Sequence, residues 1–212
     1  MNKKYFAFFI VCLFFVVIIT SACMDEETAN PFKTANVGDY VTMGDYPQTK
    51  NGDIQPIEWL VLAKEEDRML VISRYGLDTM RFDSRSGDWS VSEIHKWANN
   101  YFYRESFSEQ EKKIIKYVNG DKVFLLSKEE AEKYFANDDA RCCEATEYAI
   151  KKSAIVSNGS MGGRTGYTWW WLRTTSPDYA NNLYLVKSAG DIDYFCCHNH
   201  DIVVRPALWI KI

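Results

Sequence analysis

The sequence predicts a single α+β domain, because strand-like segments towards both ends of the chain flank a helical middle. Before residue 75, short runs rich in β-branched and aromatic residues alternate with turn signals such as Asn51-Gly52-Asp53. Between residues 90 and 152, serines placed three residues ahead of glutamates mark helix starts. The rest of the chain returns to aromatic and apolar runs separated by glycines, and no internal repeat is visible.

The expected strands are short and apolar. They comprise residues 40–43, 57–63, 68–73, 123–126, 169–173, 182–186 and 203–212. Pro206 interrupts the last of them, and since proline has no N–H to donate, it indicates an edge position or a bulge. A turn is expected at Gly190 and Asp191, and residues 157–166, with four glycines, are expected to form a loop.

Three capping boxes predict helices in the middle of the chain. In each box the serine side chain accepts from a backbone N–H while the glutamate reaches back to the cap. The pairs are Ser90 with Glu93, Ser108 with Glu111, and Ser127 with Glu130. A fourth short helix is expected over residues 146–152.

The first 23 residues have the order of a secretory signal. Lys3 and Lys4 precede an apolar run over residues 5–19, and small residues then lead to Cys23. The small residues before a cysteine resemble the lipobox of bacterial lipoproteins, although Thr20 stands where that motif has an aliphatic residue. We therefore expect residues 1–22 to be a signal peptide and Cys23 to carry a lipid. An uncleaved anchor, or cleavage near Ala22 without a lipid, are the alternatives.

All three versions place the rest of the chain outside the cytoplasm, with the membrane as a partner through the N-terminal anchor. Residues 23–36 are polar and acidic and are expected to be a flexible tether, and residues 37–212 the folded domain. The formal net charge of −4 comes without a basic patch, which argues against a nucleic-acid partner.

The cysteines of the domain form two adjacent pairs, Cys142 with Cys143 and Cys196 with Cys197. Outside the cell, disulfides between the two pairs are possible, and free thiols are the alternative. His198 and His200 add metal-ligating groups next to the second pair. Zinc ligands are usually spaced by two or more residues, so that four such groups within five positions do not converge easily. We therefore expect no metal site and no cofactor.

Seven strings, in this order along the chain, resemble the DUF6273 domain, a family of unknown function, over residues 38–212. They are GDYVTMGDYPQT, IEWLVL, WSVSEIHKWANNYFY, SFSEQE, VFLLSKEEAEKYF, WWWLRT and VRPALWI. That family is similar in fold to the C-type-lectin-like domains of the formylglycine-generating-enzyme group. The resemblance implies small twisted antiparallel sheets, two to four short helices, paired first and last strands, and a long irregular loop before the last strand.

Catalytic residues are not expected. Formylglycine-generating enzymes depend on two cysteines several residues apart, whereas Cys196 and Cys197 are adjacent. Nucleophile elbows, phosphate-cradling loops and paired metalloprotease histidines are also missing from the sequence. An enzyme or accessory protein of the formylglycine-generating type therefore stays an alternative, as does a structural component of the cell envelope.

Ligand binding is the preferred function, with a glycan or a protein as the ligand. Residues 190–201 are crowded with acidic, aromatic, histidine and asparagine side chains, which recognise ligands by stacking and hydrogen bonding. In C-type-lectin-like domains the loop before the last strand is often the binding face. The predicted binding residues are Asp191, Asp193, Tyr194, Phe195, His198, Asn199 and His200. An ordinary polar hairpin is the alternative.

The tryptophans are expected mainly in the core, because their burial removes a large apolar area from water. Trp170 should face the opposite side of its strand from Trp169 and Trp171. An exposed member of this triplet could instead stack on a sugar ring. The other tryptophans expected in the core are Trp59, Trp89, Trp97 and Trp209.

Overall fold

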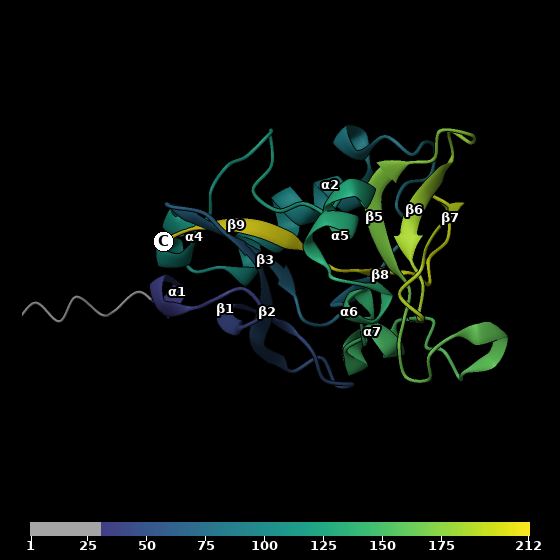
Figure 1. Cartoon of the computed structure of the whole chain (residues 1–212), viewed down its shortest axis with the longest axis horizontal. Coiled ribbons are helices and arrows are strands. Elements are labelled where there is room, and N and C mark those ends of the chain that lie inside the picture. The colour runs from purple at the N-terminus through teal and green to yellow at the C-terminus, as the bar shows by residue number, and fades with distance from the viewer. Residues whose placement is uncertain (1–30) are drawn as a thin grey trace, which may run out of the picture.

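The computed structural model describes residues 31–212, so that the expected signal peptide, Cys23 and the start of the tether lie outside it. Within that range two sheets lie towards opposite ends of the long axis, with short helices between and around them (Figure 1). This arrangement confirms the predicted α+β class. None of the helices in residues 31–212 is long and apolar enough to span a bilayer.

The first sheet has four antiparallel strands in the order β1-β2-β3-β9. They are β1 (Tyr40–Pro47), β2 (Ile54–Lys64), β3 (Arg68–Ser73) and β9 (Ala207–Lys211). The last strand pairs with β3, in a register that sets Leu70 opposite Trp209. The first and last strands therefore lie at opposite edges of this sheet, and the pairing between them that the family resemblance implied is wrong.

The second sheet has five strands in the order β4-β8-β5-β6-β7. They are β4 (Asp78–Thr79), β8 (Val203–Val204), β5 (Trp170–Thr175), β6 (Asn182–Val186) and β7 (Ile192–Cys196). Strands β6 and β7 form a hairpin whose turn contains Gly190, as predicted. The expectation of a loop before the last strand is wrong over residues 192–196, because each of these residues pairs with β6.

Pro206 marks the point where the chain passes from one sheet to the other. Strand β8 ends at Val204 in the second sheet, and β9 begins at Ala207 in the first. The predicted interruption is confirmed, and its cause is this change of sheet. Arg205 is buried at the crossing, where its Nε donates to Ser73 O at 2.8 Å.

Short helices connect the strands, and there are more of them than the two to four expected. They are α1 (Pro31–Thr34), α2 (Glu93–Lys96), α3 (Tyr103–Ser106), α4 (Glu109–Ile114), α5 (Lys128–Tyr134), α6 (Asp138–Arg141) and α7 (Glu147–Lys151). A π-helical turn, η2 (Trp97–Phe102), joins α2 to α3, and 3-10 turns form η1 (Trp89–Val91) and η3 (Ser160–Gly162).

Two of the three predicted capping boxes are present, at Ser108 of α4 and at Ser127 of α5. The first box is wrong, because Ser92 rather than Ser90 caps α2, by accepting from His95 N. Ser90 lies within η1, which Asp88 caps. Thr146 caps α7 and confirms the fourth predicted helix.

Two other segments differ from expectation. Residues 123–126 form no strand beyond a bridge from Phe124 to Ala207, because all four side chains are buried as core filling rather than alternating between two faces. The last part of the expected tether belongs to the fold. Phe32 and Ala35 are buried, and Lys64 Nζ donates to Ala35 O at 2.8 Å.

The tryptophans follow the expected pattern with one exception. Trp59, Trp170 and Trp171 are fully buried, and Trp209 is 8% exposed. Trp89 and Trp97 are half-buried and pack against the core. Trp170 and Trp171 belong to different core clusters, which confirms that they face opposite sides of the sheet. Trp169 is only half-buried, and it is described below.

A buried polar network joins the first sheet to α7. Tyr46 Oη donates to Asp78 Oδ2 at 2.6 Å, and Lys152 Nζ lies 2.6 Å from Asp78 Oδ1. Burial, followed by the neighbouring Asp78 carboxylate, raises the pKa of Tyr46 well above its ordinary value. The phenol therefore remains a hydrogen-bond donor at all physiological pH values.

Replacing Tyr46 by Phe is expected to lower the free energy of unfolding by about 1.5 kcal/mol, because a buried carboxylate oxygen loses its donor. Urea unfolding measures this change. Tyr40→Phe is the matched control, since the Tyr40 side chain is exposed and its loss of a hydroxyl should cost less than about 0.5 kcal/mol. Equal midpoints for the two variants would contradict the proposed role of the network.

Candidate functional site

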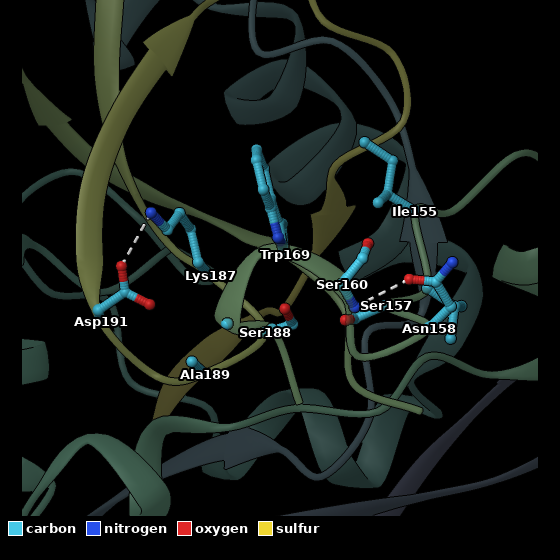
Figure 2. Close-up of a pocket in the computed structure, with 12 residues that line it drawn as sticks. Ile155, Ser157, Asn158, Ser160, Trp169, Lys187, Ser188, Ala189 and Asp191 are labelled. Atoms are coloured by element: carbon cyan, nitrogen blue, oxygen red, sulfur yellow. Dashed lines mark hydrogen bonds and ion pairs between the residues drawn. The ribbon is translucent and has the colours of Figure 1, made fainter. Parts of the chain in front are cut away.

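A cleft of about 710 Å³ opens beside the second sheet. One wall is the loop over residues 155–163, and the other is the turn between β6 and β7, residues 187–191 (Figure 2). Trp169, immediately before β5, lies between the two walls. Ile155 and Val156 add apolar surface, and Lys187 and Asp191 are the charged residues of the lining. The remaining lining residues are polar or small, namely Ser157, Asn158, Ser160, Gly162, Gly163, Ser188 and Ala189.

Long-range hydrogen bonds hold the loop wall in place. Ile155 N donates to Asp201 O at 2.9 Å, and Thr168 Oγ1 donates to Ile155 O at 2.6 Å. Gly163 allows the loop to approach the opposite wall, because a Cβ there would lie 2.4 Å from Ser157 Oγ and 2.7 Å from Ser188 Oγ. The two serine hydroxyls therefore reach the cleft from opposite walls.

The turn wall is anchored to α6. Gly190 has a φ of +88°, and its N–H donates to Lys187 O at 2.9 Å. The buried Arg141 side chain donates from Nε to Gly190 O at 2.9 Å and also pairs with Asp138. Both the N–H and the carbonyl oxygen of Gly190 are therefore hydrogen-bonded, which fixes the position of the turn.

Trp169 presents an aromatic surface to the cleft. Phe195 of β7 packs against it, with ring centroids 5.9 Å apart and an interplanar angle of 76°. Phe195 is 41% exposed, so that both rings remain accessible from solvent. The neighbouring Trp170 and Trp171 are fully buried in the sheet, which fixes the backbone that carries Trp169.

Charge in the cleft is balanced locally. Lys187 Nζ lies 3.0 Å from Asp191 Oδ2 and 3.1 Å from Asp193 Oδ2. Hydrogen bonds to Asp191 and then to Asp193 raise the pKa of Lys187. Burial raises the pKa of Asp193, but the hydrogen bond from Tyr194 N and the Lys187 ammonium outweigh it and hold that pKa below its ordinary value. Among the described residues that line the cleft, Lys187 is the only cation, and it is already neutralised.

The predicted binding residues are only partly gathered at this cleft. Asp191 lines it, Asp193 contacts it through Lys187, and Phe195 contacts it through Trp169. Tyr194 faces the other side of β7, where it packs against Tyr184 and Tyr179 at 6.2 and 5.8 Å.

The remaining three predicted residues lie elsewhere. His198 contacts Cys196 and Ser84. Asn199 Oδ1 accepts from Asp201 N at 2.8 Å and so closes a local turn. His200 lines a separate shallow pocket with Arg81, Glu93 and Lys152. The structure therefore does not bring His198, Asn199 and His200 to the cleft.

Sequence reasoning missed most of the polar lining of the cleft. Ser157, Asn158 and Ser160 belong to a glycine-rich segment that local patterns identify only as a loop. Lys187 and Ser188 follow a predicted strand without any motif. The possible exposure of one tryptophan in the triplet was the only available signal.

The four cysteines of the described residues are free thiols in this structure, which is one of the two states that the sequence left open. Burial raises the pKa of Cys142 and of Cys143, and it raises the pKa of Cys197 to about 11. A raised pKa disfavours the thiolate form, which is the form that a nucleophilic cysteine requires.

Together, these features define a small two-sheet α+β domain with a lateral cleft. Comparison with known proteins places it further: the family model described as "Domain of unknown function (DUF6273)" matches residues 66–212, which is more than half of the chain. The chain belongs to this family. The match begins after the end of β2, so that both β1 and β2 lie outside it. No curated protein and no solved structure shows significant similarity to the chain.

Proposed function

We propose that this domain binds a neutral carbohydrate in the cleft around Trp169. The observation that carries the proposal is an accessible tryptophan set between two walls that both carry serine hydroxyls, one of them also an asparagine amide. The apolar face of a sugar ring stacks on an indole, while its hydroxyls need donors and acceptors at the rim. Ser157, Asn158 and Ser188 supply such groups.

The charge balance favours a neutral ligand over an anionic one. A phosphate or carboxylate would need a cation to offset its charge, but Lys187 already pairs with Asp191 and Asp193. The Lys187 ammonium and the two carboxylates can instead exchange hydrogen bonds with sugar hydroxyls at no change in net charge. A cleft of about 710 Å³ has the size of typical small-ligand sites and suits a short oligosaccharide.

We also propose that the domain acts outside the cytoplasm, tethered to the membrane by a lipid on Cys23 and by the segment that leads from it to the fold. The signal-like order of the N-terminal sequence supports this location. In Figure 1, α1 lies at one end of the molecule and the loop with η3 at the other, an orientation that would direct the cleft away from the anchor. The proposal includes the C-type-lectin-like relationship; small, mostly antiparallel sheets support it, whereas the separated edges of β1 and β9 do not.

Replacing Trp169 by Ala is expected to weaken glycan capture at least about tenfold, because stacking is lost while the polar rim remains. The full chain, kept in mild detergent, is applied to an array of neutral and charged glycans and cell-surface proteins. Bound glycans are then titrated for each variant. Phe195→Ala should weaken capture as well, since Phe195 supports the Trp169 ring.

Two control variants also replace an aromatic residue by alanine, but outside the cleft. Tyr117→Ala removes a side chain that is 65% exposed and not in the cleft lining, and Tyr194→Ala removes the ring on the other side of β7. Both should bind as the parent chain does. If the Trp169→Ala variant still captures glycans as the parent chain does, the proposed site is wrong. If the parent chain captures proteins but no glycans, the ligand is a protein instead of a glycan. An enzyme of the formylglycine-generating type or a structural component predicts no capture by this cleft.

A further inference from the structure

A second cluster with chemical potential lies at the end of β7. The Sγ atoms of Cys196 and Cys197 and a ring nitrogen of His198 all lie within 4.8 Å of one another. Four ligands were not expected to converge from this stretch, and they do not, since His200 lines a different pocket. Three of them do converge, because the chain turns directly after β7, where Asn199 N donates to Cys196 O at 3.2 Å.

The histidine ring is oriented as a metal ligand would be. His198 Nε2 lies 2.9 Å from the Ser84 carbonyl oxygen, which can only accept, so that Nε2 carries the hydrogen. The lone pair of Nδ1 then faces Cys196 Sγ at 3.1 Å. Ligating histidines generally donate their second ring nitrogen to a carbonyl or carboxylate in this way, which fixes the tautomer and the ring orientation.

The backbone around the cluster is held from both sides. Cys197 N donates to Asn181 O at 2.8 Å, and Cys197 O accepts from Phe82 N at 2.9 Å and from Asp83 N at 3.2 Å. Cys196 is paired with Asn182 on β6. These hydrogen bonds fix the backbone that carries the two thiols and the imidazole in the absence of a metal ion.

We propose that Cys196, Cys197 and His198 form a three-ligand site for Zn²⁺, with water as the fourth ligand. Two thiolates and an imidazole are the donor set that zinc prefers. Around one tetrahedral zinc ion, sulfur and nitrogen ligands lie about 3.5–3.8 Å apart, which the present separation reaches with small side-chain rotations. Cys197 is buried, whereas His198 is exposed, so that the ion has a solvent-facing side for the water.

The other cysteine pair provides an internal comparison. Cys142 and Cys143 are also adjacent, but their thiols diverge: Cys142 Sγ lies 3.6 Å from Ser188 O, and Cys143 Sγ lies 3.7 Å from Arg74 O. Among the described residues neither thiol forms a hydrogen bond with a histidine, and Arg164, a cation, lies beside Cys142. Adjacency alone therefore does not make a site, and the histidine with its oriented ring distinguishes the second pair.

The test uses Co²⁺ as a spectroscopic probe of the full, reduced chain. Cobalt should bind one ion per chain with a thiolate charge-transfer band and the visible bands of tetrahedral coordination, and Zn²⁺ should displace it. Cys196→Ser and His198→Gln should each weaken Zn²⁺ binding at least about tenfold. Both residues are partly or fully exposed, so that these variants should remain folded, and circular dichroism checks this.

Cys142→Ser and His200→Gln are the matched controls, one for an adjacent cysteine and one for a neighbouring histidine. Both should bind zinc as the parent chain does. Spectra without charge-transfer bands would overturn the site, and so would binding that survives Cys196→Ser, since other cysteines of the chain would then hold the ion. A Cys196–Cys197 disulfide that persists under reducing conditions would overturn it as well.

Discussion

Replacing Gly190 by Ala is expected to lower the free energy of unfolding by about 3 kcal/mol and to abolish ligand capture. A Cβ at this position would lie 1.8 Å from Asp138 O and 2.4 Å from Asp138 C. Both are backbone atoms of α6, so that no side chain can rotate away. The φ of +88° adds strain for any residue with a side chain. The turn must therefore leave α6, and it would take Lys187 and Asp191 out of the cleft.

Gly166→Ala separates the clash from the strained backbone. Gly166 has the same φ of +88°, but a Cβ there would meet nothing within 4 Å. This variant should lose only about 1 kcal/mol and keep its ligand. Urea unfolding of both variants measures the difference. Equal losses would show that the contact between the β6–β7 turn and α6 contributes nothing.

Replacing Trp170 by Ala is expected to cost about 3–5 kcal/mol, the usual range for a fully buried tryptophan. Its Nε1 donates to Arg141 O at 3.0 Å, the guanidinium of Arg205 lies 4.9 Å from its ring, and Phe135 packs at 6.2 Å. The substitution leaves a cavity where β8 meets β5 and removes the donor to a carbonyl of α6. The thermal midpoint should fall by roughly 6–20 °C, or the chain should fail to fold.

Trp169→Ala is the natural control for this loss of stability, because it removes the same side chain one residue earlier. Trp169 is half-buried in the cleft, so that its loss should cost less than about 1 kcal/mol. We therefore expect the Trp170 substitution to lower stability and the Trp169 substitution to weaken ligand binding. A large loss of stability in Trp169→Ala would show that the Trp169 ring belongs to the core, and would contradict its role in ligand binding.

Local signals were sufficient for elements whose two ends are both marked in the sequence. Residues 68–73 and 182–186 form strands with the predicted bounds, since charged or turn-forming residues flank each apolar run. Ser108 and Ser127 start the helices predicted from them, although Ser106, three residues ahead of Glu109, offers a competing pattern before Ser108. Ser90 failed because Ser92 offers a second hydroxyl two residues later, and periodicity does not distinguish the two positions.

The site was less accessible to sequence reasoning, because long-range contacts build it. The loop wall depends on a bond from Ile155 to Asp201, and the turn wall on contacts from Gly190 to α6. A crowded segment also need not be one surface. Strand alternation sends Tyr194 and Phe195 to opposite faces of β7, and the following turn removes His198 from both. The sequence predicted strand β6 and the turn at Gly190, but not strand β7, and it predicted only part of the residues that reach the cleft.

The passage of the chain from β8 to β9 at Pro206 has a consequence for the timing of folding. Neither sheet is complete without residues 203–211. In the first sheet, β9 pairs with β3, which lies more than 130 positions earlier in the sequence. In the second sheet, β8 joins β4 to β5. An emerging polypeptide that lacks these residues can complete neither sheet, and such distant pairing is slow. The nascent chain would therefore complete its fold only after its last residues have emerged, which is compatible with the export proposed above.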